Sequence, residues 1–262
     1  MSDDLVLYRL SGAVAVLTLN RPERKNAWTI PLQRRYLGLL ADCDRDPAVR
    51  AIVITGSGST FCPGADTAEL TVYTQTGDFN PEMGLIEQPD YFPLLVGKPM
   101  IAAINGACAG IGLMQTLMCD VRIAVTGARM TTAFARRGLP ALHGSAWLLP
   151  RLIGLSRATE LLLSGRTFTT DEAAELGLIH RIVPVGAALE AALEYAEDLA
   201  SNCSPASIRT MKAQLRAAAE QDVVTSITAG LELERAALAS ADFAEGVRSF
   251  IERRPPSFPA PH

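Results

Sequence analysis

The sequence is poor in histidine and has no paired cysteine motif. Its three histidines, His143, His180 and His262, lie far apart and lack the spacing of metal ligands. The five cysteines are an odd number, include no CxxC pair and lie mostly in apolar surroundings. These absences argue against a metal site and a disulfide framework, and they favour reduced thiols in a cytoplasmic protein.

The chain also lacks long apolar runs and a strong excess of one charge. No segment reaches about 18 apolar residues without a charge, and the first ten residues, MSDDLVLYRL, do not resemble a signal peptide. We therefore expect no membrane segment. The net charge is −4, which indicates no nucleic-acid partner. An anionic ligand would have to meet a local basic cluster.

Common nucleotide and hydrolase motifs are missing as well. Gly110-Ile111-Gly112 begins a GxG, but Gln115 replaces the third glycine of GxGxxG, which argues against a dinucleotide site. The loop GSGST at 56–60 lacks the lysine of a phosphate-binding loop. No GxSxG occurs, so nothing supports a serine hydrolase.

What is present is a chain of 262 residues, 48% hydrophobic, that can bury a full core. Strand-like runs alternate with helical patterns, which predicts an α/β core over residues 1–200. Beyond that core, we expect a helical C-terminal region at 201–262. The predicted strands include a hairpin at Val6–Leu10 and Ala13–Leu19, and buried strands at Val49–Thr55 and Val121–Val125.

Capping residues mark the predicted helix starts. Thr29, Asp66, Thr169 and Ser204 stand at N-cap positions, and Asp242 could start the last helix. The polar segment Thr74–Pro93 lacks periodicity and predicts a mobile loop near a site.

The stretch Pro99–Asp120, PMIAAINGACAGIGLMQTLMCD, is the most informative one. A short apolar run passes through Asn105-Gly106 and Gly110-Ile111-Gly112 into a helical pattern. Such a turn aims backbone N–H groups at a negative charge. From these residues alone, phosphate, a dinucleotide and a developing oxyanion all stay open.

Four motifs in order narrow this choice. They are NRPERKNA at 20–27, FCPGAD at 61–66, INGACAGIGL continuing to MCDVRIA, and RLIG followed by LLLSGR and DEAAELGLIHRIV. Together they resemble the crotonase family, the enoyl-CoA hydratases and isomerases, over roughly residues 5 to 255. The resemblance implies a spiral of ββα units, a C-terminal region that builds homotrimers or dimers of trimers, and an acyl-CoA substrate without a separate cofactor.

The resemblance also implies which residues touch the substrate. In this family two backbone N–H groups hold the thioester oxygen while an enolate forms, and motif matching assigns them to Ala65 and Ile111. The basic loop with Arg21, Arg24 and Lys25 resembles the loop that contacts CoA. Further substrate contacts are expected from Ala27, Asp66, Thr67, Ala68 and Gly110, and, reaching a neighbouring subunit's CoA, from Phe250, Arg253 and Arg254.

The usual catalytic carboxylates of the family are absent. Met114 and Phe134 stand at the two hydratase positions, and Leu142 stands at the isomerase position, which makes the expected pocket apolar. None of these side chains can transfer a proton. His143, beside the isomerase position, is the candidate base because imidazole titrates near neutrality. Weaker candidates are Asp66, Tyr73, Glu87 and Asp90.

Two hypotheses therefore follow from the sequence. The first is an enoyl-CoA hydratase or isomerase of low or altered activity. The second is a non-catalytic acyl-CoA binder, and a weaker third is a structural subunit of a mixed oligomer.

Overall fold

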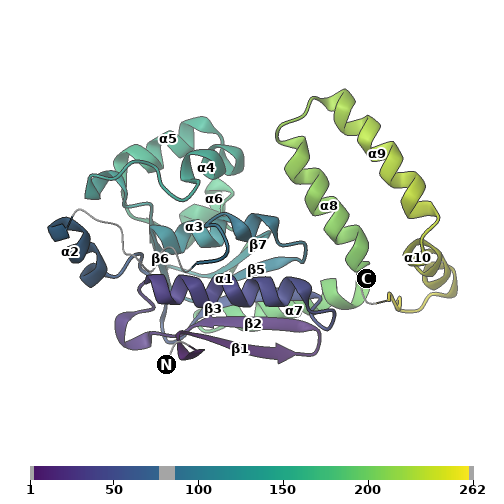
Figure 1. Cartoon of the computed structure of the whole chain (residues 1–262), viewed down its shortest axis with the longest axis horizontal. Coiled ribbons are helices and arrows are strands. Elements are labelled where there is room, and N and C mark those ends of the chain that lie inside the picture. Colours follow the sequence, from purple (N-terminus) through teal and green to yellow (C-terminus); the bar gives the residue numbers. More distant parts are fainter. Residues whose placement is uncertain (1–2, 77–85, 260–262) are drawn as a thin grey trace.

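The computed structural model describes residues 3–76 and 86–259, which form two sheets surrounded by helices (Figure 1). In the larger sheet, β1 (Val6–Ser11) pairs antiparallel with β2 (Val14–Leu19). The parallel strands β3 (Ala51–Gly56), β5 (Met100–Ile104), β7 (Val121–Val125) and β10 (Arg181–Val183) follow in that order. The smaller sheet contains β4 (Thr60–Cys62), β6 (Ala107–Ala109), β8 (Arg129–Thr131) and β9 (Phe168–Thr169).

One unit of two strands is repeated along the chain. In each of the strand pairs β3–β4, β5–β6 and β7–β8, the first strand belongs to the larger sheet and the second to the smaller sheet. The three pairs follow one another in the same order in both sheets. The helices α2 (Thr67–Thr76) and α3 (Ile111–Leu117) follow the first two pairs, and a 3-10 turn at Ala135–Arg137 precedes α4 (Ser145–Ile153). This arrangement confirms the predicted spiral of ββα units. It also sets the ends of β4 and β6 side by side.

Both faces of the larger sheet are buried at β2, β3, β5 and β7, which explains the nearly continuous apolar sequence of these strands, whereas β1 at the edge is mostly exposed. Leu17, Ile54 and Ala102 face α1 (Ile30–Arg45) and the smaller sheet. Side chains of the other face, such as Val53 and Ile101, pack against α7 (Ala188–Asn202). The stripe of α7 that meets them is made of alanines, which let the helix approach the sheet closely: Ala188, Ala191, Ala192, Ala196 and Ala200.

All four predicted N-caps are confirmed. The side chains of Thr29, Asp66, Thr169 and Ser204 accept hydrogen bonds from backbone N–H groups two or three residues ahead, at 2.9–3.3 Å. The prediction that Asp242 starts the last helix was wrong by two residues. Ser240 caps α10 (Ala241–Glu252), because its hydroxyl accepts from the Phe243 N–H at 3.1 Å.

The loop predicted at Thr74–Pro93 is shorter in the structure. Helix α2 continues through its first residues to Thr76, and a 3-10 turn at Phe92–Leu95 occupies its end. Residues 77–85 of this prediction lie outside the described residues.

The C-terminal helices extend away from the sheets as an arm (Figure 1). The arm consists of α8 (Pro205–Ala218), α9 (Val223–Leu238) and α10. Side chains of α8 tie it to the core: Lys212 donates to the Lys98 carbonyl at 2.8 Å, Arg216 donates to the Leu94 carbonyl at 2.9 Å, and Arg209 pairs with Asp44. Large apolar side chains stay exposed on the arm, among them Leu215, Ile227, Leu231, Phe250 and Ile251. Among the described residues no helix is long and apolar enough to cross a membrane.

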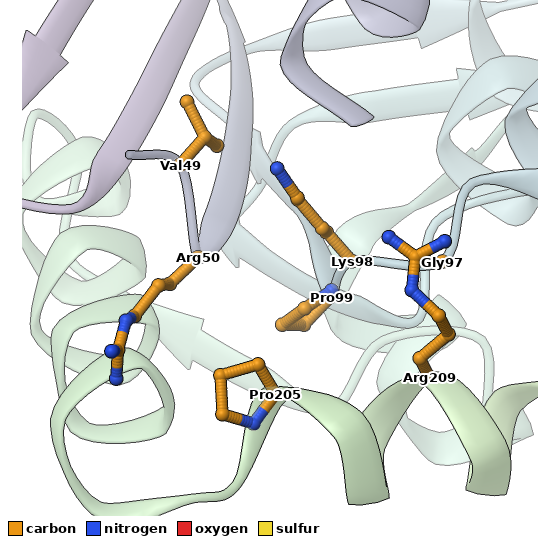
Figure 2. A pocket seen from close by; sticks show the side chains of 7 residues that line it. All are labelled: Val49, Arg50, Gly97, Lys98, Pro99, Pro205 and Arg209. Carbon is orange, nitrogen blue, oxygen red and sulfur yellow. The ribbon is translucent and has the colours of Figure 1, made fainter. Parts of the chain in front are cut away.

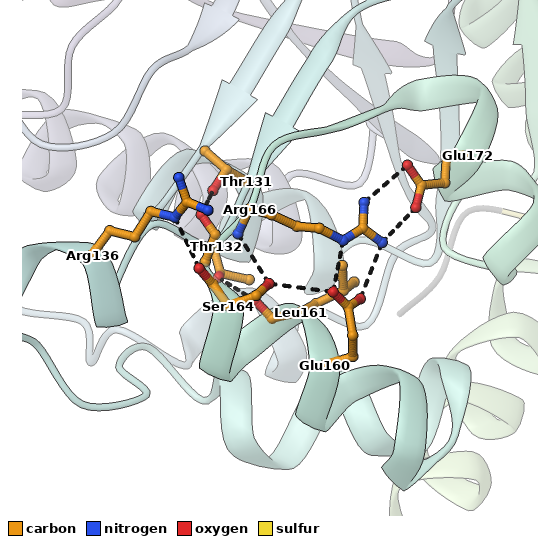
Figure 3. A network of polar contacts seen from close by, with 9 residues as sticks. Thr131, Thr132, Arg136, Glu160, Leu161, Ser164, Arg166 and Glu172 are labelled. Atoms are coloured by element: carbon orange, nitrogen blue, oxygen red, sulfur yellow. Dashed lines mark hydrogen bonds and ion pairs between the residues drawn. The ribbon is translucent and has the colours of Figure 1, made fainter.

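A polar network fixes α5 (Leu155–Ser164) against β8 and α6 (Thr170–Leu176) (Figure 3). The Arg166 guanidinium lies between the carboxylates of Glu160 and Glu172, donating to both. On the other side of α5, Thr132 donates to the Leu161 carbonyl at 3.0 Å and Arg136 donates to the Ser164 carbonyl at 2.9 Å. These contacts hold the segment on which Phe134 lies.

The buried Arg122 on β7 fixes the far end of α3. Its guanidinium is 3% exposed and donates to the carbonyls of Leu178 and Cys119, each at 2.6 Å, and of Thr116 at 3.3 Å. We expect Arg122→Leu to lower the free energy of unfolding by about 3 kcal/mol, because it leaves buried carbonyls unpaired. Chemical denaturation followed by circular dichroism measures this loss.

Arg45→Ala is the matched control for that substitution. The Arg45 side chain is 75% exposed and its ion pair with Asp42 is a surface pair, so we expect a change within about 0.5 kcal/mol. Equal losses in the two variants would contradict the role assigned to Arg122.

Candidate active site

Two backbone turns meet where β4 and β6 end. Gly64 and Gly110 follow these strands, and both have positive φ, +109° and +50°, which side chains rarely allow. A Cβ placed on Gly110 would lie 3.8 Å from the Gly64 Cα, so the two turns are neighbours. The residues that follow these glycines are Ala65 and Ile111, the two positions assigned to the thioester oxygen.

The N–H groups of Ala65 and Ile111 are both unpaired. Neither donates a hydrogen bond to any described residue. An unpaired N–H is costly unless water or a ligand accepts its bond. Two such donors on adjacent turns are suited to accept an oxygen that carries negative charge. We call the segments Gly64-Ala65 and Gly110-Ile111 the oxyanion turns.

Tight packing holds each turn in place. Trp28 pairs with the Ala65 turn on both sides, donating to the Gly64 carbonyl and accepting from the Asp66 N–H, each at 2.8 Å. Behind the other turn, a Cβ on Gly112 would come within 2.6 Å of the Cys62 Cβ. Glycine is required there, since α3 starts directly against β4.

The three positions at which the resemblance leads us to expect carboxylates carry apolar side chains that contribute to the core. Met114 is fully buried on α3 and Phe134 is 6% exposed, and both belong to the cluster that contains Ile111. Leu142 is half-buried and packs against the same cluster. These three residues thus belong to or pack against the same core cluster as Ile111, and none of their side chains can transfer a proton.

His143 borders this apolar wall. Its ring centre lies 6.4 Å from that of Phe134, and its side chain is 23% exposed. Its φ of +52° is unusual for a residue with a side chain and is followed by another left-handed residue, Gly144. The Nδ1 atom lies 3.5 Å from the Asp90 carboxylate. The hydrogen bond to His143 outweighs burial and lowers the pKa of Asp90 below its usual value.

Part of the basic loop is already neutralised by Asp66. This carboxylate is buried and accepts from the Arg21 guanidinium at 3.0 Å, and Arg24 lies 3.7 Å away. Burial opposes charge on Asp66, but the hydrogen bonds from Ala68 and Arg21 outweigh it, so the pKa of Asp66 lies below its usual value. Asp66 thus acts as a helix cap and ion-pair partner, which leaves Arg24 and Lys25 as the exposed cations of the loop.

The remaining predicted contacts differ in their positions. Both backbone polar groups of Ala27 are hydrogen-bonded within the loop, because its N–H donates to Arg24 and its carbonyl accepts from Arg21. Thr67 and Ala68 are exposed in the first turn of α2, beside the oxyanion turns. Phe250 is 85% exposed on α10, and Arg253 ends that helix. Figure 1 shows α10 in the arm, far from α2 and α3, so within one chain this helix does not reach the oxyanion turns.

A second concave region lies at the opposite ends of the strands (Figure 2). It is lined by Arg50, Lys98 and Arg209 together with Val49, Gly97, Pro99 and Pro205. Its cations have partners, because Lys98 donates to the carbonyls of Cys43 and Asp46, Arg50 donates to the Phe258 carbonyl, and Arg209 pairs with Asp44. This region is a structural joint between β3, β5 and α8.

Comparison with known proteins agrees with this geometry. The family model described as enoyl-CoA hydratase/isomerase matches residues 9–261. The chain belongs to the enoyl-CoA hydratase/isomerase family. A putative enoyl-CoA hydratase of Thermus thermophilus is 37% identical over 94% of this chain and 98% of the relative. The 1,2-epoxyphenylacetyl-CoA isomerase of Escherichia coli is 32% identical over 97% of this chain and 98% of the relative.

Solved structures of the family have the same fold. A probable enoyl-CoA hydratase/isomerase from Mycobacterium abscessus superposes with a TM-score of 0.88 and 34% identity, covering 98% of this chain and 99% of the other. An enoyl-CoA hydratase subunit from Geobacillus kaustophilus gives a TM-score of 0.89 at 29% identity, with both chains fully covered. The predicted crotonase-like architecture, including a helical C-terminal region, is therefore confirmed.

Sequence reasoning missed the partner of His143 in this member of the enoyl-CoA hydratase/isomerase family. Asp90 was only one of the weaker candidates, and Gln33 was not among the candidates. Nothing in the spacing of these residues, 57 positions apart for Gln33 and Asp90, predicts that they meet. Asp90 lies just before Phe92–Leu95, and that turn returns the chain to the larger sheet beside α1.

Proposed function

We propose that the chain binds an acyl-CoA thioester and stabilises its enolate. The thioester oxygen accepts hydrogen bonds from the N–H groups of Ala65 and Ile111. The observation that carries this proposal is the pair of unpaired donors on adjacent turns. Each preorganised donor of this kind lowers the activation barrier by a few kcal/mol, because it stabilises the negative charge that develops on the oxygen in the transition state.

His143 is proposed as the group that moves the proton. It is the titratable side chain placed at the edge of the wall formed by Met114, Phe134 and Leu142, and its exposed fraction lets substrate reach it. Imidazole takes a proton from the carbon next to the thioester or from its vinylogous position, and the bonding electrons move to the thioester oxygen. Returning that proton to a different carbon shifts the double bond, so atoms and electrons balance without a co-reactant.

This single base favours double-bond isomerisation over hydration. Hydration needs one group to activate water and a second to protonate the α-carbon. The two hydratase positions are Met114 and Phe134, and neither can do this. An isomerase-type reaction of an enoyl-CoA is therefore the activity we propose.

A direct assay with unsaturated thioesters tests the proposal. The protein is incubated with 3-enoyl-CoA and 2-enoyl-CoA substrates of several chain lengths, and the products are separated by chromatography. We expect interconversion of the two double-bond positions and little formation of 3-hydroxyacyl-CoA. Isomerisation rates equal to those in buffer at every acyl-chain length would reject the proposed isomerase activity.

A non-catalytic acyl-CoA binder is the second candidate. It is favoured by the apolar character of Met114, Phe134 and Leu142, which suits an acyl chain better than it suits proton transfer. Titration calorimetry with saturated acyl-CoA thioesters would then show binding that strengthens with chain length. Binding in this manner without any turnover of enoyl-CoA would support the binder over the enzyme.

The CoA portion of the ligand is proposed to lie along the basic loop. Arg24 and Lys25 are exposed there and can pair with its phosphates. Residues 1–200 would serve as the catalytic core and 201–262 as the trimerisation region, in which Phe250 and Arg253 reach the CoA of a neighbouring subunit. The exposed apolar side chains of the arm support such contacts. Its five free thiols support a cytoplasmic location.

Light scattering after size-exclusion chromatography tests this assembly. We expect a mass of three or six times the chain mass of 28.0 kDa. A monomer at micromolar concentration would reject the trimer and with it the role of Phe250 and Arg253.

A glutamate should be tolerated at position 142 and should destabilise the protein at position 114. Leu142 is half-buried, so Leu142→Glu can keep its carboxylate near water, and we expect a folded protein with increased isomerase activity. Met114 is fully buried, so Met114→Glu places a carboxyl in the apolar core and should cost several kcal/mol of stability. Thermal melts and the isomerase assay on both variants measure this difference. A stable, active Met114→Glu variant would contradict it.

A further inference from the structure

A chain of polar contacts links the oxyanion turn to His143. It begins at Trp28, whose backbone pairs with the Ala65 turn and whose indole N–H donates to the Gln33 side-chain oxygen at 3.0 Å. The Gln33 amide N–H then donates to one oxygen of Asp90. The other Asp90 oxygen lies 3.5 Å from the His143 Nδ1.

The inner part of this chain is rigid. Trp28, just before α1, is 3% exposed, and Gln33, on the buried face of α1, is 5% exposed. The edge-on contact of Trp28 with the fully buried Tyr36, at 5.5 Å between ring centres, further limits the movement of the indole. Because the amide group of Gln33 donates to Asp90 through its nitrogen and accepts from Trp28 through its oxygen, its orientation is determined.

That orientation decides which Asp90 oxygen faces which neighbour. Gln33 donates to the Asp90 Oδ1, and the other oxygen, Oδ2, is the one that lies 3.5 Å from the His143 Nδ1. An ionised carboxylate can only accept, so a hydrogen bond across this 3.5 Å contact requires the ring proton of a neutral His143 to be on Nδ1. The Nε2 atom has no hydrogen-bond partner among the described residues and is then an unprotonated base.

We propose that Asp90, oriented by Gln33 and Trp28, is the positioning residue that holds His143 in the Nδ1-protonated tautomer with Nε2 available as the base. This assignment rests on the proposed function for the use made of Nε2. The tautomer itself is a property of the free protein. Trp28 then helps to position both groups. Its backbone pairs with the Ala65 turn, and its indole is connected to His143 through Gln33 and Asp90.

Substituting Asp90 by asparagine should move the ring proton of His143 from one nitrogen to the other. Gln33 still donates to the side-chain oxygen at position 90, so the new amide N–H₂ points at His143. The imidazole must then accept at Nδ1, and its proton moves to Nε2. Asp90→Asn is therefore expected to reverse the tautomer while keeping the shape of the side chain.

Nitrogen NMR of the full chain labelled with ¹⁵N-histidine reads this out directly. The sequence has three histidines, so His143→Gln identifies the relevant signals. His180 is an internal reference of the opposite kind, because its Nδ1 accepts from the Arg122 N–H at 3.2 Å. Asp42→Asn is the matched control, since Asp42 is a surface carboxylate paired with Arg45.

We expect His143 to be protonated on Nδ1 in the wild type and in Asp42→Asn, and on Nε2 in Asp90→Asn. Gln33→Leu should give a mixture of the two tautomers. Turnover of an enoyl-CoA should fall on the order of 10²–10³-fold in Asp90→Asn, mainly in kcat. The same His143 tautomer in the wild type and Asp90→Asn, or unchanged kcat in Asp90→Asn, overturns the proposal.

The proposed enzyme activity and the proposed role of Asp90 can be rejected separately. If the wild type turns over no acyl-CoA while the tautomer reverses in Asp90→Asn, the proposed enzyme is rejected and the positioning of His143 stands. If turnover is found and the tautomer does not change, the enzyme stands and the role of Asp90 is rejected.

Discussion

Replacing Ile111 with proline is expected to lower kcat/KM for an enoyl-CoA by about 10²–10³-fold without unfolding the protein. Proline has no N–H, so the substitution removes one of the two donors proposed for the thioester oxygen. This decrease in kcat/KM equals a loss of transition-state stabilisation of roughly 3–4 kcal/mol, which is the effect of removing one oxyanion-hole donor from other enzymes.

The position is unusually suited to this test. Ile111 is the first residue of α3, where a proline is well tolerated because that N–H has no partner within the helix. The preceding residue, Gly110, has φ +50° and ψ −125°, the mirror image of the extended conformation that precedes prolines. Glycine adopts this mirror conformation without strain.

Ile111→Ala is the matched control, since it shortens the side chain and keeps the N–H. The Ile111 side chain is 7% exposed and packs in the core, so both variants lose apolar contacts. If Ile111→Ala lost as much activity as Ile111→Pro at equal stability, the backbone donor would have no special role.

Substituting His143 by alanine should have an effect of similar or greater size. We expect kcat for double-bond isomerisation to fall on the order of 10²–10⁴-fold, because the base that moves the proton is removed. Binding of a saturated acyl-CoA, measured by calorimetry, should change little. Added imidazole should restore part of the rate, since it can enter the space left by the side chain.

His180→Gln is the control for that experiment. His180 directly precedes β10 and accepts from the Arg122 N–H near the start of β7, and it is not among the residues assigned to the substrate. Its replacement should leave kcat within about twofold. An unchanged rate in His143→Ala would remove His143 from the mechanism.

The architecture could be predicted from the sequence because it depends on local patterns. Thr29, Asp66, Thr169 and Ser204 were identified as caps from residue type and spacing alone, and each is confirmed. The buried strands were readable because both sheet faces are covered, which makes them continuously apolar. The start of α10 was missed by two residues, since Ser240 and Asp242 both have capping side chains.

The candidate site was predictable in part. The positions of Ala65 and Ile111 came from motifs; in the structure they lie on adjacent turns, and their N–H groups donate to no described residue. The side-chain chemistry was harder, because Arg21 is engaged by Asp66 across 45 residues of sequence. Likewise, Asp90 meets Gln33 and His143 only through the fold. Contacts between distant segments leave no periodicity or spacing in the sequence.

Hydrogen exchange at the α-carbon of a saturated acyl-CoA tests the enolate most directly. In D₂O, formation of the enolate replaces the α-protons by deuterium, and this needs no double bond to move and no water to add. Proton NMR of butyryl-CoA follows the loss of the α-signal with time. We predict exchange well above the buffer rate with the wild type and Ile111→Ala, and exchange reduced on the order of 10²-fold with Ile111→Pro. Exchange at the buffer rate with the wild type, or equal exchange with and without the Ile111 N–H, would contradict an enolate held by these two backbone donors.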